Sequence, residues 1–188
     1  MSTTTGSARQ LPRPVRGRGP GYALQRAYVR IMMWLISRLL VAAAAVDPEV
    51  GKEFDRLPRS FRFVMRVRSG STGLALAKRE GRLGVASLRE SAHPDLVFEF
   101  KHIAHAFLVL SFTESTPQAF ANDRLLVDGE FPDAMRVLRA LNRMQAVVLP
   151  RFVAVRALKA YPRITLGEKV ALAVRIYARM LLQLFGGK

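Results

Sequence analysis

The sequence has 188 residues, half of them hydrophobic, and a formal net charge of +16. This length allows one ordinary domain with appendages, and the apolar content excludes a chain that is disordered throughout. There is no cysteine, which excludes disulfides, thiolate zinc sites and cysteine nucleophiles. Residues 1–46 carry seven arginines and no acid, residues 47–135 are nearly neutral, and residues 136–188 carry eleven basic side chains against Glu168 alone. A polyanion would therefore meet the two flanks of the chain rather than its middle.

The N-terminal part of the chain divides into a tail and an apolar region. Residues 1–21 are rich in Ser, Thr, Gly, Pro and Arg, which predicts a disordered basic tail. Residues 22–56 are predicted to form apolar to amphipathic helices. Arg38 interrupts the apolar run over 22–46, and a spanning helix needs about 20 apolar residues, so a helix at an interface or on its own domain is favoured. The alanines before Asp47 also fit a signal-cleavage region, so insertion, a signal segment and packing on the domain all stay open.

A short helix and a series of strands are predicted next. Asp47 followed by Pro48 is typical of an N-cap with proline in the first turn. From residue 60 the hydrophobic period changes from about 3.6 to 2, which indicates half-buried strands. Short connections make an antiparallel meander the simplest arrangement of four strands, predicted over 61–67, 74–78, 83–88 and 96–100.

Helical periodicity returns after the fourth strand. The helix over 132–148 is the clearest, with Met135, Leu138, Leu141 and Val148 predicted to face inward. The predicted elements of this half are helices over 102–112 and 116–121, a strand over 125–129, and helices over 132–148, 151–160 and 166–185.

The segment PDLVFEF…STPQAFANDRLLVDGEFPDAMRVLRAL resembles the sterol-carrier-protein type-two domain. The matching places are held by Ala119, Phe120, Arg124, Leu125, Val127, Gly129, Ala134 and Met135, while Asp123 and Glu130 depart from the common Gly and Asp. The resemblance covers roughly residues 57–145, and in architecture it is closest to bacterial accessory proteins of ubiquinone biosynthesis. It implies an α+β fold, in which a five-stranded antiparallel sheet with helices on one face encloses an apolar pocket, plus N- and C-terminal helical extensions.

This resemblance completes the predicted organisation of the chain. A sterol-carrier-like lipid-binding domain spans 57–149, and basic amphipathic helices span 150–188. The candidate ligand-binding residues are apolar side chains of this domain, for each of which plain core packing is the alternative. They are Phe98, Phe100, Phe107, Leu110, Phe120, Leu125, Met135 and Leu138.

No motif of the sequence calls for catalysis. There is no nucleophile elbow, dinucleotide-binding loop or Walker A loop. His102 and His105 stand three residues apart, but no third ligand stands close in sequence, so solvated or capping histidines are favoured over a metal site. We therefore predict a protein that is not an enzyme and has no metal or cofactor.

Two classes of function remain, with a third alternative. The first is lipid binding at an anionic membrane surface, cytoplasmic and peripheral to a bacterial inner membrane, with Trp34, Arg38, Arg175 and Arg179 as candidate membrane contacts. The last helix supports it through an apolar ridge of Leu166, Val170, Val174, Tyr177, Leu181 and Leu184. The second is nucleic-acid binding by the basic flanks, which is disfavoured because the flanks are apolar and carry no recognition motif. The third is an oligomeric scaffold that docks partner enzymes.

Overall fold

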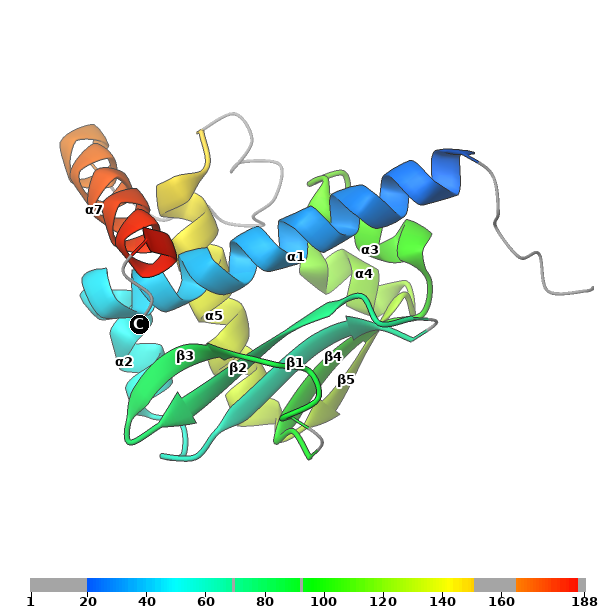
Figure 1. The fold of residues 1–188 in the computed structure, drawn as a ribbon, viewed down its shortest axis with the longest axis horizontal. Helices are drawn as coiled ribbons and strands as arrows, with labels where there is room; N and C mark the ends of the chain where they lie inside the picture. The colour runs from blue at the N-terminus through cyan, green and yellow to red at the C-terminus, as the bar shows by residue number, and fades with distance from the viewer. Residues whose placement is uncertain (1–19, 69, 92, 151–164, 186–188) are drawn as a thin grey trace, which may run out of the picture.

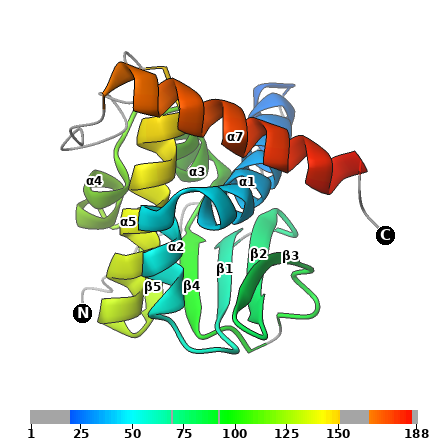
Figure 2. The same ribbon diagram turned by 90° about the vertical axis from the view of Figure 1, so that its left-hand side faces the viewer.

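The computed structural model describes residues 20–68, 70–91, 93–150 and 165–185. One sheet of five strands lies on one side of the molecule and the helices cover its other face (Figure 1; Figure 2). The strands are β1 Arg62–Val67, β2 Gly73–Arg79, β3 Arg82–Ala86, β4 Leu96–Phe100 and β5 Leu125–Gly129, in the order β3-β2-β1-β4-β5. The predicted α+β class, with five strands and helices on one face, is confirmed.

The sheet is mixed, so the predicted antiparallel meander is wrong at one place. β1 pairs with β4 in parallel, with Met65 opposite Phe98, whereas the other three pairs are antiparallel. The start of β4 is fixed beside the start of β1 because the Arg62 backbone N–H donates to the Asp95 carboxylate at 2.8 Å and the Asp95 N–H donates to the Arg62 carbonyl at 3.0 Å. The connection over 87–95 therefore carries the chain past β2 and β1 instead of turning back beside β3.

Six helices are described, and their bounds agree closely with the helical periodicity. They are α1 Pro20–Val46, α2 Pro48–Asp55, α3 Ile103–Leu110, α4 Thr116–Ala121, α5 Phe131–Val148 and α7 Leu166–Phe185. The helix predicted over 151–160 lies outside the described residues, as does nearly all of the predicted basic tail.

The long helix α1 packs on the domain. Its residues Gly21–Val46 are long and apolar enough to cross a membrane, yet half of that apolar window is buried inside the protein. Val29, Met33 and Leu40 form the side turned toward the core. The last turns are buried nearly all round, because α7 lies across this end of the helix (Figure 2). Of the three alternatives for this segment, packing on the domain is therefore the arrangement in this structure.

The next helix, α2, is fixed at both ends by polar contacts. Asp47 is its N-cap, as predicted, and accepts from the Glu49 N–H at 2.9 Å. At its C-terminal end the buried ammonium of Lys78, on β2, donates to the carbonyls of Phe54 at 2.8 Å and Leu57 at 3.0 Å. Phe54 lies in the last turn of α2, where carbonyls lack intrahelical partners, and Leu57 follows the C-cap Arg56. The lysine therefore anchors α2 to the sheet.

Arginines of α5 connect it to α2 and α7. Arg139 donates twice to Glu53, at 2.9 Å each, and this lowers the pKa of Glu53, mainly through the hydrogen bond. One turn on, the Arg143 Nε lies 2.9 Å from the Asp47 carboxylate, which is almost completely buried. Its guanidinium also lies 3.7 Å from Glu168, on α7. Arg143 therefore joins three helices at one point.

Candidate lipid-binding site

Five of the eight predicted ligand-binding residues meet in the interior. Phe98 and Phe100 point from β4 toward the helices and are buried, as are Leu125 on β5 and Leu110 on α3. Phe107 is half-buried and packs against the same cluster. This interior is apolar because alternate residues of β4 and β5 share one face of the sheet.

An aromatic contact holds α1 against α3 beside this cluster. The rings of Tyr28 and Phe107 meet edge to face at 5.2 Å. The Tyr28 hydroxyl donates to the Leu110 carbonyl at 3.2 Å, and burial raises the pKa of Tyr28. The α1 helix is thus part of the wall around the predicted pocket residues, which its separation in sequence from the carrier-like segment did not indicate.

The other three predicted residues lie elsewhere. Met135 and Leu138 are half-buried on α5 and stand outside the core cluster, because α5 turns Ala134 and Val137 inward instead. Phe120 is 58% exposed on α4, where Ala119 takes the inward position. A one-residue step turns a helical side chain by about 100°, so an inward Ala119 places Phe120 at the surface.

The half-buried apolar residues of α5 lie beside its arginines. Arg136, Arg139 and Arg143 occupy the side of α5 toward α2. Met135 stands one turn before Arg139 and borders that side, and Leu138 lies further round the helix, away from α2. Figure 2 shows α5 between α2 on one side and α4 on the other, with α3 beyond. The helices that carry the half-buried apolar residues of α5 and the exposed Phe120 are therefore neighbours in this view.

A buried polar network lies at the junction of α3, α4 and β5. Glu114 accepts from Arg124 at 2.8 Å and from Asn122 at 2.6 Å. His105 is half-buried, its Nδ1 has no partner among the described residues, and burial, followed by the charge of His102, lowers its pKa. Within the described ranges no group of three or more His, Cys, Asp or Glu side chains could hold a metal ion.

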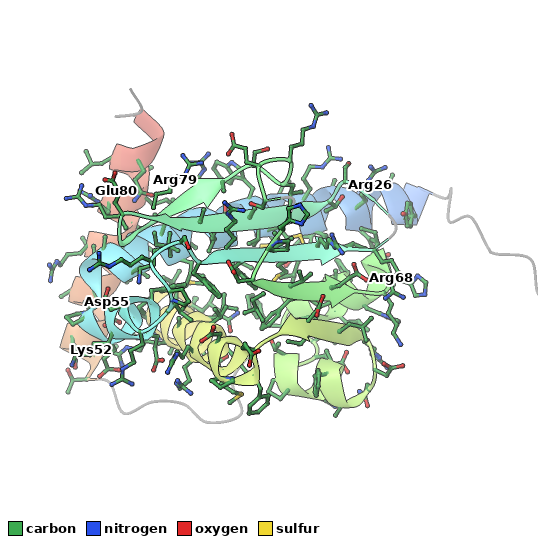
Figure 3. The ribbon with its side chains drawn as sticks, turned by 90° about the horizontal axis from the view of Figure 1, so that it is seen from below. Arg26, Lys52, Asp55, Arg68, Arg79 and Glu80 are labelled. Carbon is green, nitrogen blue, oxygen red and sulfur yellow. The ribbon has the colours of Figure 1, made fainter. Side chains whose placement is uncertain are left out.

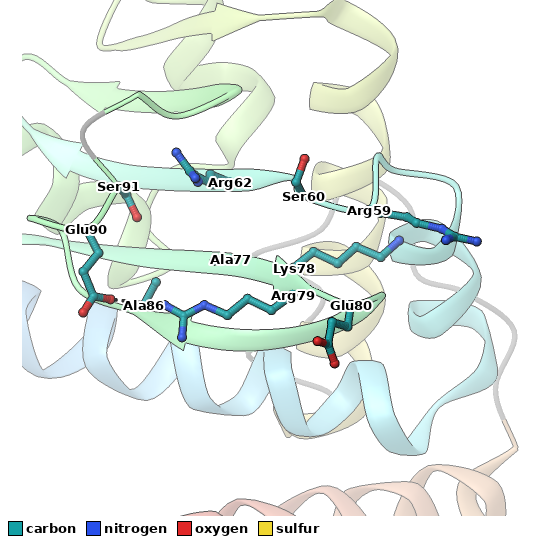
Figure 4. A pocket seen from close by; sticks show the side chains of 10 residues that line it. All are labelled: Arg59, Ser60, Arg62, Ala77, Lys78, Arg79, Glu80, Ala86, Glu90 and Ser91. Atoms are coloured by element: carbon teal, nitrogen blue, oxygen red, sulfur yellow. Dashed lines mark hydrogen bonds and ion pairs between the residues drawn. The ribbon is translucent and has the colours of Figure 1, made fainter.

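A shallow depression of about 360 Å³ opens on the outer face of the sheet (Figure 4). Arg59, Arg62 and Arg79 line it together with Glu80 and Glu90, and Arg79 pairs with Glu90 at 3.4 Å. This mixed-charge lining does not suit an apolar ligand. None of the eight predicted lining residues borders this depression.

That outer face carries many charged side chains, as the view from below shows (Figure 3), around a buried apolar row of Val64, Ala75 and Val97. Glu99 of β4 accepts from Arg68 at 2.7 Å and from Arg66 at 2.8 Å. The hydrogen bond from Arg68 is the main reason that the pKa of Glu99 lies below its usual value. The large apolar cluster, with its aromatic side chains, therefore lies on the helical side of the sheet.

The predicted membrane contacts lie on the surfaces of α1 and α7. Trp34 is 46% exposed, and the Arg38 guanidinium lies 5.1 Å from the centre of its ring. Arg175 and Arg179 are exposed on α7. The predicted ridge of α7 is present and exposed at Leu166, Val170, Val174, Tyr177 and Leu181, while the Leu184 side chain lies outside the described residues.

Sequence reasoning missed two exposed apolar residues near these contacts. Leu182 extends the open face of α7, and Leu24 extends the apolar face of α1 that contains Ile31 and Trp34. Leu24 and Ile31 stand seven residues apart, and Trp34 follows three residues later. That spacing places all three on one helical face and could have revealed the pattern.

The fold agrees in outline with the resemblance seen in the sequence. An open sheet with all helices on one face, and with the motif segment on α4, β5 and the start of α5, is the architecture that the resemblance to the sterol-carrier-protein type-two domain implies. The solved structures similar to this chain include one described as "UbiJ-SCP2 Ubiquinone synthesis protein". It is 17% identical, with a TM-score of 0.43, over 66% of this chain and 99% of that chain.

A second similar structure is a solution NMR structure of palmitated SCP2L2 from Aedes aegypti. It is 12% identical, with a TM-score of 0.33, over 54% of this chain and 91% of that chain. No family model matches the sequence, and no curated protein sequence matches it.

Proposed function

We propose that this protein is a non-enzymatic lipid-binding protein that holds or presents a hydrophobic lipid at the cytoplasmic surface of an inner membrane. An isoprenoid quinone intermediate, a phospholipid or a fatty acid would suit its interior. Its role would be that of an accessory factor in ubiquinone biosynthesis.

The proposal depends on one observation: α5 has apolar side chains that are not part of the core cluster. Met135 and Leu138 are half-buried there, and Phe131, at the start of the same side, is 75% exposed. Phe120 is also exposed on α4, the helix beside α5 in Figure 2. Exposed large apolar residues that gather near an apolar interior are typical of a binding site. We therefore place the entrance for the lipid between α5 and α4, leading to Phe98, Phe100 and Leu125.

Native mass spectrometry of the full chain, purified without detergent, tests this proposal, with organic extraction of whatever is bound. We expect a stoichiometric lipid or isoprenoid in the wild-type protein. The double substitution Met135→Gln, Leu138→Gln should lower its occupancy, because polar amides would line the entrance. Val85→Gln is the matched control, since Val85 is 45% exposed on β3, away from this entrance.

Two outcomes would contradict lipid binding. One is a folded wild-type protein that is empty and takes up neither prenylquinone nor phospholipid. The other is equal occupancy in the double variant and in Val85→Gln, with circular dichroism showing that both are folded.

A further inference from the structure

Helix α7 presents an apolar face to solvent. Leu172, Ile176 and Met180 recur at four-residue spacing and are buried against the domain. Val174 and Leu181 project from the opposite side of the helix and are 62% and 48% exposed. The outward side of this helix is therefore apolar, whereas a surface helix of a soluble domain normally turns polar residues outward.

The N-terminal half of α1 repeats this pattern. Val29 and Met33 are buried, while Leu24, Ile31 and Trp34 lie on the opposite side and are 73%, 62% and 46% exposed. Both helices lie on the side of the molecule away from the sheet, with α7 across one end of α1 (Figure 1; Figure 2). We define the two-helix face as the exposed apolar residues of both helices: Leu24, Ile31, Trp34, Leu166, Val170, Val174, Tyr177, Leu181 and Leu182.

The charges beside the two-helix face indicate which kind of partner binds there. Arg26 and Arg30 are exposed on α1, and Arg175 and Arg179 are exposed on α7. None of the four forms an ion pair with a carboxylate of the described residues. Helix α1 has no acidic residue, and the only acid of α7, Glu168, lies 3.7 Å from Arg143.

This charge pattern argues against a second copy of the chain as the occupant. A self-complementary contact would bring the same arginines of both copies together, and like charges within an interface are unfavourable. An anionic membrane surface offers the opposite charge, and long arginine side chains can reach its head groups while apolar neighbours enter the acyl boundary. The Trp34 ring, with Arg38 over it, has the amphipathic character favoured at that depth.

We infer that the two-helix face docks on an anionic phospholipid membrane, so that α7 lies at the interface and the outer face of the sheet points away from it. This inference deepens the proposed function, because it names the surface that contacts the membrane and the charge of the lipid. Cargo binding between α5 and α4 and docking through α1 and α7 use different residues, and the two can therefore fail separately.

Trp34 is the only tryptophan of the chain, so its fluorescence reports directly on this face. With vesicles of phosphatidylcholine and phosphatidylglycerol, we expect the full chain to co-float and its emission to shift to the blue. With phosphatidylcholine alone, both signals should be weak. Vesicle binding that leaves the emission of Trp34 unchanged would overturn the assigned orientation.

Substitutions test the two contributions to docking separately. The double variant Val174→Glu, Leu181→Glu should bind anionic vesicles at least about tenfold more weakly, because two carboxylates would face the acyl boundary. The pair Arg175→Gln, Arg179→Gln should lose about thirtyfold at low salt, from the attraction of each cation to an anionic surface. Val85→Glu, on the edge strand β3, is the control and should bind as the wild type does.

Lipid occupancy and oligomeric state are measured on the same variants. If the Val174→Glu, Leu181→Glu variant no longer floats with vesicles and yet keeps its bound lipid, that result would support membrane docking as a step distinct from cargo binding. The inference would be overturned if the Val174→Glu, Leu181→Glu variant floated with anionic vesicles as strongly as the wild-type protein does. A wild-type dimer that does not bind vesicles, and that the double substitution converts to a monomer, would also overturn it, by showing that the face is a subunit interface.

Discussion

The buried ammonium of Lys78 is the contact whose removal tests most directly how α2 is held on the sheet. Its three acceptors are the carbonyls of Phe54, Leu57 and Asp55, at 2.8, 3.0 and 3.3 Å. No carboxylate of the described residues pairs with it, so the charge is balanced by peptide dipoles at the C-terminal end of a helix, where the macrodipole favours a cation. Replacement of Lys78 by Met keeps much of the volume and removes every donor.

The expected loss follows mainly from the Leu57 carbonyl, whose hydrogen bond to Lys78 is fully buried, because the Phe54 carbonyl keeps the Leu57 N–H as a donor at 3.1 Å. A buried carbonyl left without a donor costs about 1–3 kcal/mol, and relief from burying the ammonium offsets part of this. We expect Lys78→Met to lower the free energy of unfolding by about 2 kcal/mol. With a urea m-value of about 2 kcal/mol/M, the midpoint should then fall by about 1 M.

Equilibrium urea unfolding followed by circular dichroism measures this loss, and Lys52→Met is the matched control. Lys52 is exposed on α2 itself, and its substitution should change stability by no more than about 0.5 kcal/mol. Equal midpoints for the two variants would refute the reasoning. If Lys78→Met unfolds α2 alone, hydrogen exchange should be faster for the amides of that helix while the amides of β1 stay protected.

Two further predictions concern stability. The pKa of His105 is lowered in the folded protein, mainly by burial, so the unfolded chain binds that proton more tightly. Its contribution is therefore present above the unfolded pKa of about 6.5 and is lost as the pH falls toward the folded value. His105→Gln should flatten the decline of the urea midpoint between about pH 7.5 and pH 5, and an unchanged decline would contradict this assignment. Gly129→Ala should cost more than Gly81→Ala in thermal unfolding, although both glycines have positive φ. A Cβ at Gly129 would lie 2.5 Å from the Asp95 carbonyl oxygen, whereas a Cβ at Gly81 meets no atom within 4 Å. Equal melting temperatures for the two variants would show that the backbone near Asp95 relaxes freely.

Local periodicity was enough to predict nearly every described element. The helix predicted over 166–185 has those bounds in the structure, and the one over 132–148 begins one residue earlier. Lys78 follows the same alternation and is buried on the face of Leu74 and Leu76. Strand and helix periods depend on neighbouring residues only, and they are therefore readable without tertiary information.

The order of the strands could not be obtained in this way. A short connection after β3 favoured a hairpin, whereas the register of β4 on β1, fixed at its start by Asp95 and Arg62, is parallel. The positions of the candidate ligand residues were also predicted only in part, because they too depend on tertiary packing. Five residues meet at the core cluster, but the rotation of α5 and the outward position of Phe120 depend on how whole helices pack.

The basic residues of the two flanks fall into two structural groups, those paired with carboxylates and those exposed without such a partner. Three of the basic residues counted in the C-terminal flank are Arg136, Arg139 and Arg143, and all three pair with carboxylates, two of them with acids of α2 or of its N-cap. Their charges are thus neutralised by acids that lie within residues 47–135. The exposed arginines of α1 and α7 have no such partner among the described residues and lie on the helices that carry the open apolar face. Since a buried pair and an exposed cation respond differently to salt, raising ionic strength should release the protein from anionic vesicles before it loosens α5 from α2.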